Sequence, residues 1–181
     1  LHPFSRLSGA ETTIGANAQI GPHGAVTLQD SRIGAGSIIG AQGAVTLQRT
    51  WTGPKTVLGM GVAEDAVFLG REHDDAPATT GVGFRVRKGS LYEEGASSAQ
   101  HTDTKMTILL PWATLGSNLN FCDVLLSGGI GDAPGKFSEV GSGTIHFNFT
   151  IRGDKATGSL LGDVVNGVFL RSERLFIGGN N

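Results

Sequence analysis

The chain has 181 residues, 39% of them hydrophobic, and a formal net charge of −2. This balance excludes a disordered polar chain and a dedicated nucleic-acid-binding domain, because the former lacks apolar residues and the latter has a basic surface. No apolar run is long enough to span a membrane. The 29 glycines are about twice the usual share of roughly 7%, which predicts an ordered chain with many tight turns.

From residue 14 to residue 70, an apolar residue followed by glycine recurs about every six residues. The clearest copies are IGPHGAVTLQ at 20–29 and IGAQGAVTLQ at 39–48. A fixed period of this kind predicts a parallel β-helix, with the apolar residue of each step pointing inward and successive coils about 4.8 Å apart. No segment shows a sustained helical period, so we expect an all-β domain.

Residues 71–107 lose this pattern, and we predict an insertion there. It begins with a polar loop, REHDDAPATTGVG, and continues with a strand in which Phe84 and Val86 alternate with Arg85 and Arg87. The coils are expected to resume over 108–181, around a second extruded loop, IGDAPGKF. The last coils contain three further apolar-glycine steps: Val140-Gly141, Leu161-Gly162 and Ile177-Gly178.

The chain starts without Met, and its N-terminal LHPFSRLSG has neither the basic start nor the apolar stretch of a signal peptide. A single cysteine, Cys122, cannot form an internal disulfide, which favours the cytoplasm. We therefore expect one cytoplasmic β-helix domain, residues 1–181, that is a piece of a longer protein.

The segment GSGTIHFNF at 141–149, followed by Gly-Asp-Lys, resembles the GxGTIxxNY…K signature of bacterial left-handed β-helix sugar transferases. The closest resemblance is to the acetyltransferase half of the bifunctional N-acetylglucosamine-1-phosphate uridyltransferases, which are UDP-N-acetylglucosamine pyrophosphorylases. It runs from Ser138 to about Asn181 and includes IGGN at 177–180. The resemblance implies left-handed coils with hexapeptide repeats and a homotrimer with sites between subunits.

The same resemblance implies that Asn148, Phe149 and Lys155 contact a sugar nucleotide. An amide suits sugar hydroxyls and a lysine suits phosphate. Phe149 stands where the signature has Tyr, so one polar contact is lost. The alternative for Asn148 is a purely structural place at a coil corner.

The family's catalytic histidine lies about one coil earlier, in a stretch that aligns with NFCDVLLSGG. Here Asn120 and Asp123 stand in that stretch as candidate substrate-binding residues, and no histidine is present. A transacylase needs a base, so this departure puts acetyl transfer in question. Cys122 would need an adjacent base to act as a nucleophile, and the alternative is a buried, inert thiol.

Two histidines remain as candidate catalytic bases. His101, Asp103 and Lys105 alternate, so a strand would place them on one side as a base with its carboxylate, and the alternative is a polar loop. His146 lies inside the signature, and the alternative is a histidine stacked between coils. The five histidines include no pair with zinc-ligand spacing, so we expect no metal in this domain.

These observations predict the C-terminal module of a nucleotide-sugar transferase-like protein, with a nucleotidyltransferase domain before it in the full chain. Its ligand would be a sugar phosphate or a nucleotide sugar, and acetyl-CoA would be the donor if it acts as an acyltransferase. The alternative is a non-catalytic scaffold that trimerises an attached nucleotidyltransferase domain or senses a sugar nucleotide.

Overall fold

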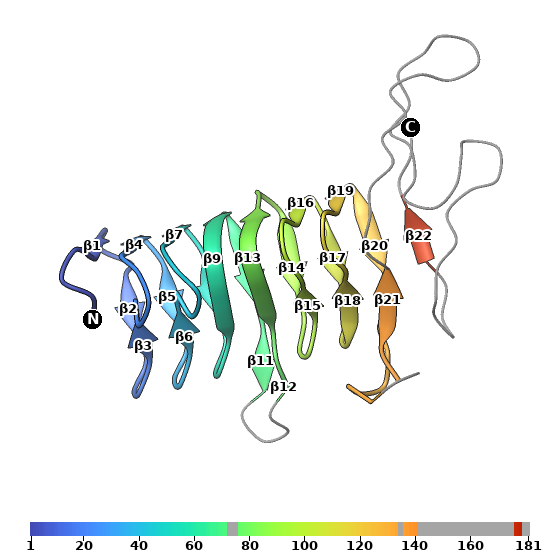
Figure 1. Cartoon of the computed structure of the whole chain (residues 1–181), viewed down its shortest axis with the longest axis horizontal. Helices are drawn as coiled ribbons and strands as arrows, with labels where there is room; N and C mark the ends of the chain where they lie inside the picture. The colour runs from blue at the N-terminus through green and yellow to red at the C-terminus, as the bar shows by residue number, and fades with distance from the viewer. Residues whose placement is uncertain (72–75, 134–135, 141–175, 179–181) are drawn as a thin grey trace, which may run out of the picture.

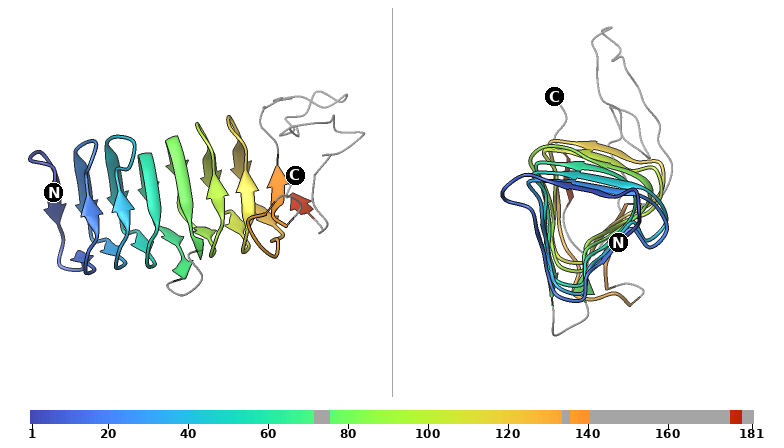
Figure 2. Two further views of the ribbon diagram at one scale, coloured as in Figure 1. Left: turned by 60° about the horizontal axis from the view of Figure 1, so that its bottom comes forward. Right: turned by 90° about the vertical axis from the view of Figure 1, so that its left-hand side faces the viewer.

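The chain folds into a left-handed parallel β-helix, a solenoid whose coils stack along one axis (Figures 1 and 2). The computed structural model describes residues 1–71, 76–133, 136–140 and 176–178. The regular secondary structure of these residues consists of β-strands, without a helix. The cross-section of the solenoid is triangular (Figure 2). The predicted fold class, an all-β left-handed helix with two extruded loops, is confirmed.

One side of the triangle, called the polar face below, carries mainly polar side chains on its outer surface. Its strands pair in parallel, so equivalent residues of neighbouring coils form columns. The duplicated VTLQ segments lie side by side with Val26 opposite Val45, as the repeat predicts. The strands are β1 (Arg6–Ser8), β4 (Val26–Gln29), β7 (Val45–Gln48), the C-terminal parts of β9 (Val57–Glu64) and β13 (Thr79–Val86), β16 (Asp103–Lys105) and β19 (Asn120–Cys122).

The second side, called the apolar face, is a separate eight-stranded sheet. Its strands are β2 (Thr13–Ile14), β5 (Arg32–Ile33), β8 (Trp51–Thr52), β10 (Ala66–Phe68), β14 (Ser90–Tyr92), β17 (Ile108–Leu109), β20 (Val124–Leu126) and β22 (Phe176–Gly178). All pairs are parallel except the last, in which β22 runs antiparallel to β20. The predicted coil step at Ile177-Gly178 is therefore wrong in direction, and Leu161-Gly162 lies outside the described residues.

The third face is joined to the polar face because β9 and β13 continue around the corner between them. Its strands are β3 (Gln19–Ile20), β6 (Ile38–Ile39), the N-terminal parts of β9 and β13, β15 (Ser97–Ser98), β18 (Ala113–Leu115) and β21 (Ser138–Val140). These two long strands tie two faces into one twelve-stranded sheet.

Inward side chains fill the solenoid in columns that follow the strand register. Leu28, Leu47 and Ile39 are fully buried, and each contributes about 1.5–3 kcal/mol through removal of its apolar surface from water. In the middle coils the core changes to aromatic rings. Phe68 and Tyr92 lie on adjacent strands with ring centroids 5.1 Å apart and planes tilted by 59°.

The coil that holds Tyr92 has a polar interior. Its other inward side chains are small, and most carry hydroxyls: Ser90, Ala96, Ser98, Thr102 and Thr104. The Tyr92 hydroxyl lies 3.4 Å from Thr104 Oγ1. One ring therefore occupies the middle of the triangle and leaves room only for small neighbours.

This polar coil explains why the predicted insertion over 71–107 is wrong for most of its length. β13, β14, β15 and β16 continue the parallel ladders without a break. Their inward positions are largely Ser, Thr and Ala, so the apolar period disappears from the sequence although the coil persists. Among the described residues of this segment, only the antiparallel hairpin of β11 (Gly70–Arg71) and β12 (Ala76–Pro77) leaves the solenoid.

The second extruded loop is present between β20 and β21, as predicted. Its base is closed by a hydrogen bond from the Ile130 amide to the Lys136 carbonyl at 2.6 Å. Both loops leave at the corner between the apolar face and the third face, at the lower edge of Figure 1. The polar face is therefore free of extruded segments in the described part of the chain.

Candidate functional site

A compact group of polar side chains lies on the polar face, where β13, β16 and β19 are neighbours at the upper edge of Figure 1. Arg85 pairs with Asp103, and Asp103 pairs with Asn120, so these residues form one outward column. A second column beside it contains Arg87, Lys105 and Cys122, with Lys105 opposite Cys122. We call these six residues the polar array.

Successive side chains of a β-strand point to opposite faces, so the residues of the polar array point outward. Phe84, Val86, Thr104 and Phe121 are buried between the array residues and anchor the three strands on the core. The predicted alternation of Phe84 and Val86 with Arg85 and Arg87 is confirmed. A strand surface held in this way keeps side-chain origins fixed, which favours a preorganised site.

Asp103 is the centre of the charge network. It accepts a hydrogen bond from Arg87 Nε at 2.7 Å, and Arg85 Nη1 lies 3.9 Å from its other oxygen. The Arg85 side chain is 66% exposed, against 30% for Arg87. Arg87 is thus largely committed to Asp103, whereas Arg85 is held weakly and faces solvent.

The remaining members of the array add a cation, an amide and a thiol. Arg87 Nη2 donates to Cys122 Sγ at 3.6 Å, and the Cys122 thiol points to Asn120 Oδ1 at 3.8 Å. Cys122 is half-exposed, so the predicted alternative of a fully buried thiol is wrong. Lys105 is exposed and, among the described residues, has no ion-pair partner. The array therefore sets three cations against one carboxylate.

His101 and Asp123 lie at corners rather than within strands. Each has a positive φ, 54° for His101 and 58° for Asp123, and each side chain is exposed. The His101 ring lies over Gly83 of the preceding coil, where a Cβ would meet the imidazole at 2.5 Å. Within the described residues no hydrogen bond joins His101 to Asp103, because Arg87 and Arg85 take the carboxylate. The predicted His-carboxylate pair is not formed.

The structure thus brings Asp103, Lys105, Asn120 and Cys122 together and leaves His101 and Asp123 at the edge. His146, Asn148, Phe149 and Lys155 lie outside the described residues. The sequence interpretation missed the arginines as site residues and read them only as the solvent side of a strand. The coil period was the available signal, since Arg85, Asp103 and Asn120 are spaced eighteen and seventeen residues apart.

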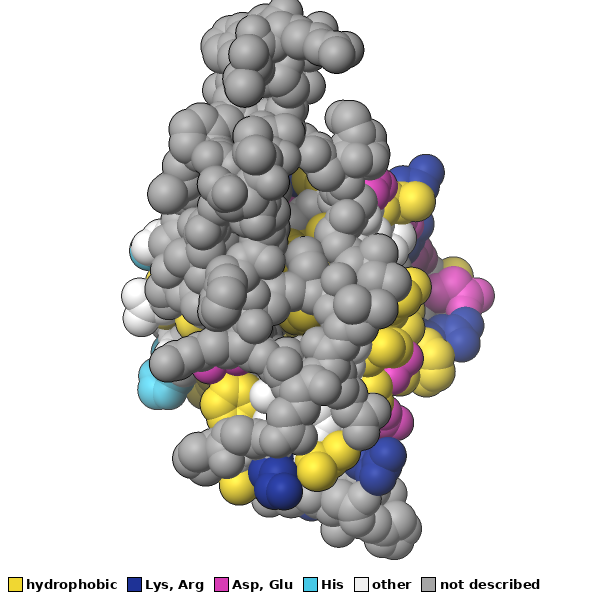
Figure 3. All heavy atoms as spheres, turned by 90° about the vertical axis from the view of Figure 1, so that its right-hand side faces the viewer, with side chains coloured by type: hydrophobic (Ala, Val, Ile, Leu, Met, Phe, Trp, Pro, Cys, Tyr) yellow, Lys and Arg dark blue, Asp and Glu magenta, His cyan; other side chains and the backbone are white. Residues whose placement is uncertain are grey.

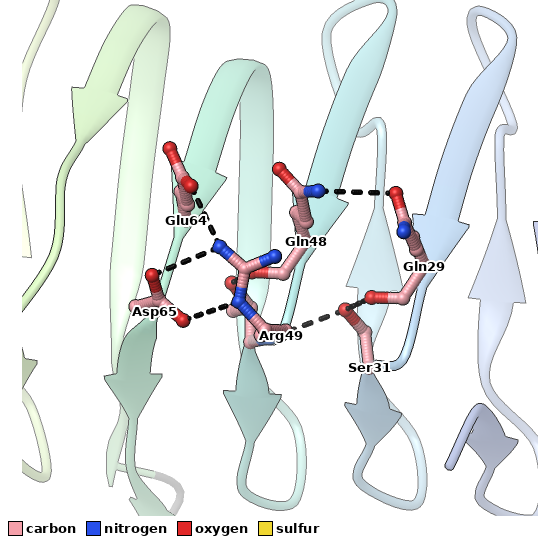
Figure 4. A network of polar contacts seen from close by, with 7 residues as sticks. Gln29, Ser31, Gln48, Arg49, Glu64 and Asp65 are labelled. Atoms are coloured by element: carbon pink, nitrogen blue, oxygen red, sulfur yellow. Dashed lines mark hydrogen bonds and ion pairs between the residues drawn. The ribbon is translucent and has the colours of Figure 1, made fainter. Parts of the chain in front are cut away.

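A second polar network lies at the corner beside β7 and β9 and has a different character (Figure 4). Arg49 binds Asp65 at 2.6 and 3.0 Å and Glu64 at 2.6 Å. The hydrogen bond from Arg49 lowers the pKa of Asp65, and the two carboxylates raise the pKa of Arg49. The Arg49 guanidinium already binds two carboxylates, so it is not available to an anionic ligand. The network instead stabilises the contact between adjacent coils.

The apolar face carries a column of outward hydrophobic side chains. Trp51, Ile108 and Leu125 are 53%, 39% and 41% exposed. The column is formed, in register over successive coils, by Trp51, Val67, Leu91, Ile108 and Leu125. In the view from the C-terminal end, hydrophobic side chains lie beside charged ones along the right-hand edge of the molecule (Figure 3). Such a column of exposed hydrophobic side chains is a candidate contact surface.

Within the described residues, no group of three or more His, Cys, Asp or Glu is placed to hold a metal ion, and no helix could cross a membrane. The chain matches no protein-family model and no curated protein sequence.

Proposed function

We propose that this chain is the β-helix module of a nucleotide-sugar transferase-like protein, and that the polar array binds a sugar phosphate or a nucleotide sugar. The observation that carries the proposal is the excess of cations on a rigid strand surface: Arg85, Arg87 and Lys105 surround the single carboxylate of Asp103. The chain as a whole is slightly acidic. A local cationic cluster on it favours an anionic ligand.

The chemistry of the array suits the two halves of such a ligand. Lysine and arginine bind phosphoryl oxygens through charge-assisted hydrogen bonds. The Asn120 amide both donates and accepts, and the exposed Asp123 carboxylate accepts, so both suit sugar hydroxyls. The resemblance of residues 138–181 to sugar transferases supports the same ligand class and adds Asn148, Phe149 and Lys155 as expected contacts. A cytoplasmic location belongs to the same proposal.

Thermal unfolding with two ligands tests the proposal. A ligand that binds only the native state raises the melting temperature, so UDP-N-acetylglucosamine should stabilise the protein in a concentration-dependent way. Acetyl-CoA at the same concentrations is the comparison. Absence of any shift with the sugar nucleotide, up to millimolar concentration, would contradict the proposal.

Lys105→Ala should weaken binding of UDP-N-acetylglucosamine by about 10- to 100-fold. The physical reason is loss of a charge-assisted contact, which contributes about 1.5–3 kcal/mol. Isothermal titration calorimetry measures the change. Lys136→Ala, the same substitution at an exposed lysine on the second extruded loop, is the control and should leave the affinity unchanged. Equal affinities for the two variants would remove Lys105 from the site.

The second candidate function is a non-catalytic scaffold that senses a sugar nucleotide for an attached nucleotidyltransferase domain. It is favoured by His101, whose expected carboxylate partner, Asp103, is bound by arginines instead. Stabilisation by UDP-N-acetylglucosamine alone would favour the scaffold. Stabilisation by acetyl-CoA as well would favour acyl transfer, with His101 or His146 as the base.

We also propose that the module is a homotrimer that buries the apolar column between subunits. Ile108→Asp places a charge within that column, and it should convert the trimer to monomers, as measured by light scattering after size-exclusion chromatography. Val62→Asp is the matched control, because Val62 is a 47% exposed outward residue on the polar face. A trimeric Ile108→Asp protein, or a monomeric unchanged chain, would contradict this assembly.

A further inference from the structure

We infer that the coil around Tyr92 encloses a binding site for one water molecule, held by the hydroxyls of Tyr92, Ser98 and Thr102. The site lies in the interior of the solenoid and is independent of any ligand on the polar face. Its water is a fixed part of the fold, because a buried water with about three hydrogen bonds is costly to remove.

The observation that carries the inference is a group of buried hydroxyls without hydrogen-bond partners. Among the residues that the structure describes, four buried side-chain polar atoms have no partner, and three of them belong to this one coil: Ser90 Oγ, Ser98 Oγ and Thr102 Oγ1. None of these three residues is more than 5% exposed. Since buried polar groups in proteins are nearly always hydrogen-bonded, such a cluster points to a partner that is not a protein atom.

Buried hydroxyls in the neighbouring coils are satisfied by the backbone. Ser37 Oγ donates to the Gly53 carbonyl at 3.0 Å. Thr107, which begins the coil after that of Tyr92, donates to the Lys105 carbonyl at 2.9 Å. The unpartnered hydroxyls of the Tyr92 coil therefore depart from the pattern of this fold and need an explanation of their own.

The phenol of Tyr92 is the group on which these hydroxyls converge. Its ring enters from the apolar face, whereas Ser98 lies on the third face and Thr102 directly before β16 of the polar face. Burial raises the pKa of the phenol, and the hydroxyls of Thr104, Ser98 and Thr102 lie close enough to oppose that rise. Thr104 is within hydrogen-bond distance at 3.4 Å. Ser98 and Thr102 face the phenol without a direct hydrogen bond, as groups bridged by a water do.

The coil also has room for a water molecule between these side chains. In the next coil, the positions in register with Ser98, Thr102 and Thr104 hold larger buried side chains: Leu115, Leu119 and Phe121. The ring of Tyr92 takes up part of this difference in volume. A water molecule, whose share of liquid volume is about 30 Å³, is small enough to take up more of it.

A single water molecule satisfies the hydroxyls of both other faces at once. It accepts a hydrogen bond from the Tyr92 hydroxyl and donates one each to Ser98 Oγ and Thr102 Oγ1. The Tyr92 oxygen then accepts from Thr104. Ser90 lies on the same strand as Tyr92 and is not part of the site. The water explains why the central ring is a tyrosine, since phenylalanine would remove the group that holds it.

A crystal structure of the protein at a resolution that shows ordered waters tests the inference directly. We expect one water within about 2.5–3.2 Å of Tyr92 Oη, Ser98 Oγ and Thr102 Oγ1. The inference is overturned by absence of density between these three atoms. A direct hydrogen bond from Ser98 or Thr102 to the phenol overturns it as well.

Thr102→Val gives a second test in solution, because valine has nearly the shape of threonine and lacks the hydroxyl. If the hydroxyl holds the water, its loss should lower the melting temperature by about 2–4 °C, as for one hydrogen bond. If the hydroxyl has no partner, its removal relieves the penalty of burying it and raises the melting temperature. Thr46→Val, the same substitution at an exposed position of β7, is the control and should leave the melting temperature near that of the unchanged protein. An unchanged or raised melting temperature in Thr102→Val overturns the inference, and the crystal structure of the unchanged chain decides if this variant does not fold.

Discussion

Replacing Gly61 with alanine should destabilise the protein by about 3 kcal/mol or more and lower its melting temperature by about 6–12 °C. Gly61 lies at the corner inside β9 and has a φ of +157°, which L-residues with a side chain rarely adopt. A Cβ there would lie 2.1 Å from the Phe84 carbonyl oxygen and 2.7 Å from Cγ of its ring. Neither the backbone nor the buried ring can move away without a shift of β13.

The position of Gly61 makes this clash serious for the whole solenoid. Its amide donates to the Ala44 carbonyl at 3.1 Å, and its partner on the other side is Phe84. Gly61 therefore takes part in the pairing of β9 with both of its neighbours, β7 and β13. A displaced β13 would loosen the polar array as well, because Arg85 follows Phe84 directly.

Gly131→Ala is the matched control for this substitution. A Cβ at Gly131 would lie 3.7 Å from the nearest atom, the Lys136 Cβ, which is an ordinary contact. Its stability should change by less than about 0.5 kcal/mol. Thermal unfolding followed by circular dichroism measures both variants. Similar melting temperatures for the two would show that the corner at Gly61 can relax.

The sequence predicts the fold best where inward residues are aliphatic. Ile20, Ile33, Ile39 and Leu58 follow the six-residue step, and all four are buried. The duplicated decapeptide even predicts the register of β4 and β7. Between residues 90 and 105 the coil is filled by Ser, Thr, one Ala and one Tyr, and local hydrophobicity no longer indicates which way a side chain points.

The site is harder to predict than the fold because it is made across coils. Asp103 with Lys105 can be identified locally, but its partners lie one coil away, Arg85 on β13 and Arg87 directly after that strand. The sequence suggests His101 as that partner since it is near in the chain. In a solenoid, residues one coil apart lie closer on the surface than many residues two positions apart in the chain. The partners of a polar residue should therefore be sought first at a distance of one coil, and only then among its near neighbours in the sequence.

Tyr92→Ala should be the most damaging core substitution, with a cost of about 3–5 kcal/mol. Tyr92 is fully buried, its ring packs on Phe68, and it fills the middle of a coil whose other inward residues are too small to close the cavity. Tyr92→Phe keeps the ring and removes only the hydroxyl that faces Thr104 at 3.4 Å, so it should cost about 1 kcal/mol. Chemical denaturation of the two variants measures the difference, and equal losses would show that the hydroxyl matters more than the ring.

Tyr92 also predicts how stability depends on pH. Burial raises the pKa of its phenol above the ordinary value near 10. The neutral phenol is favoured in the folded state, so this contribution to stability is complete below about pH 10 and is lost as the pH rises toward the folded-state pKa. Because the chain has one tyrosine, absorbance at about 295 nm reads Tyr92 alone. Phenolate should appear only together with loss of the near-ultraviolet dichroism. The decline in stability above about pH 10 should be shallower in Tyr92→Phe, whereas phenolate formation near pH 10 in a folded chain would contradict the burial of this ring.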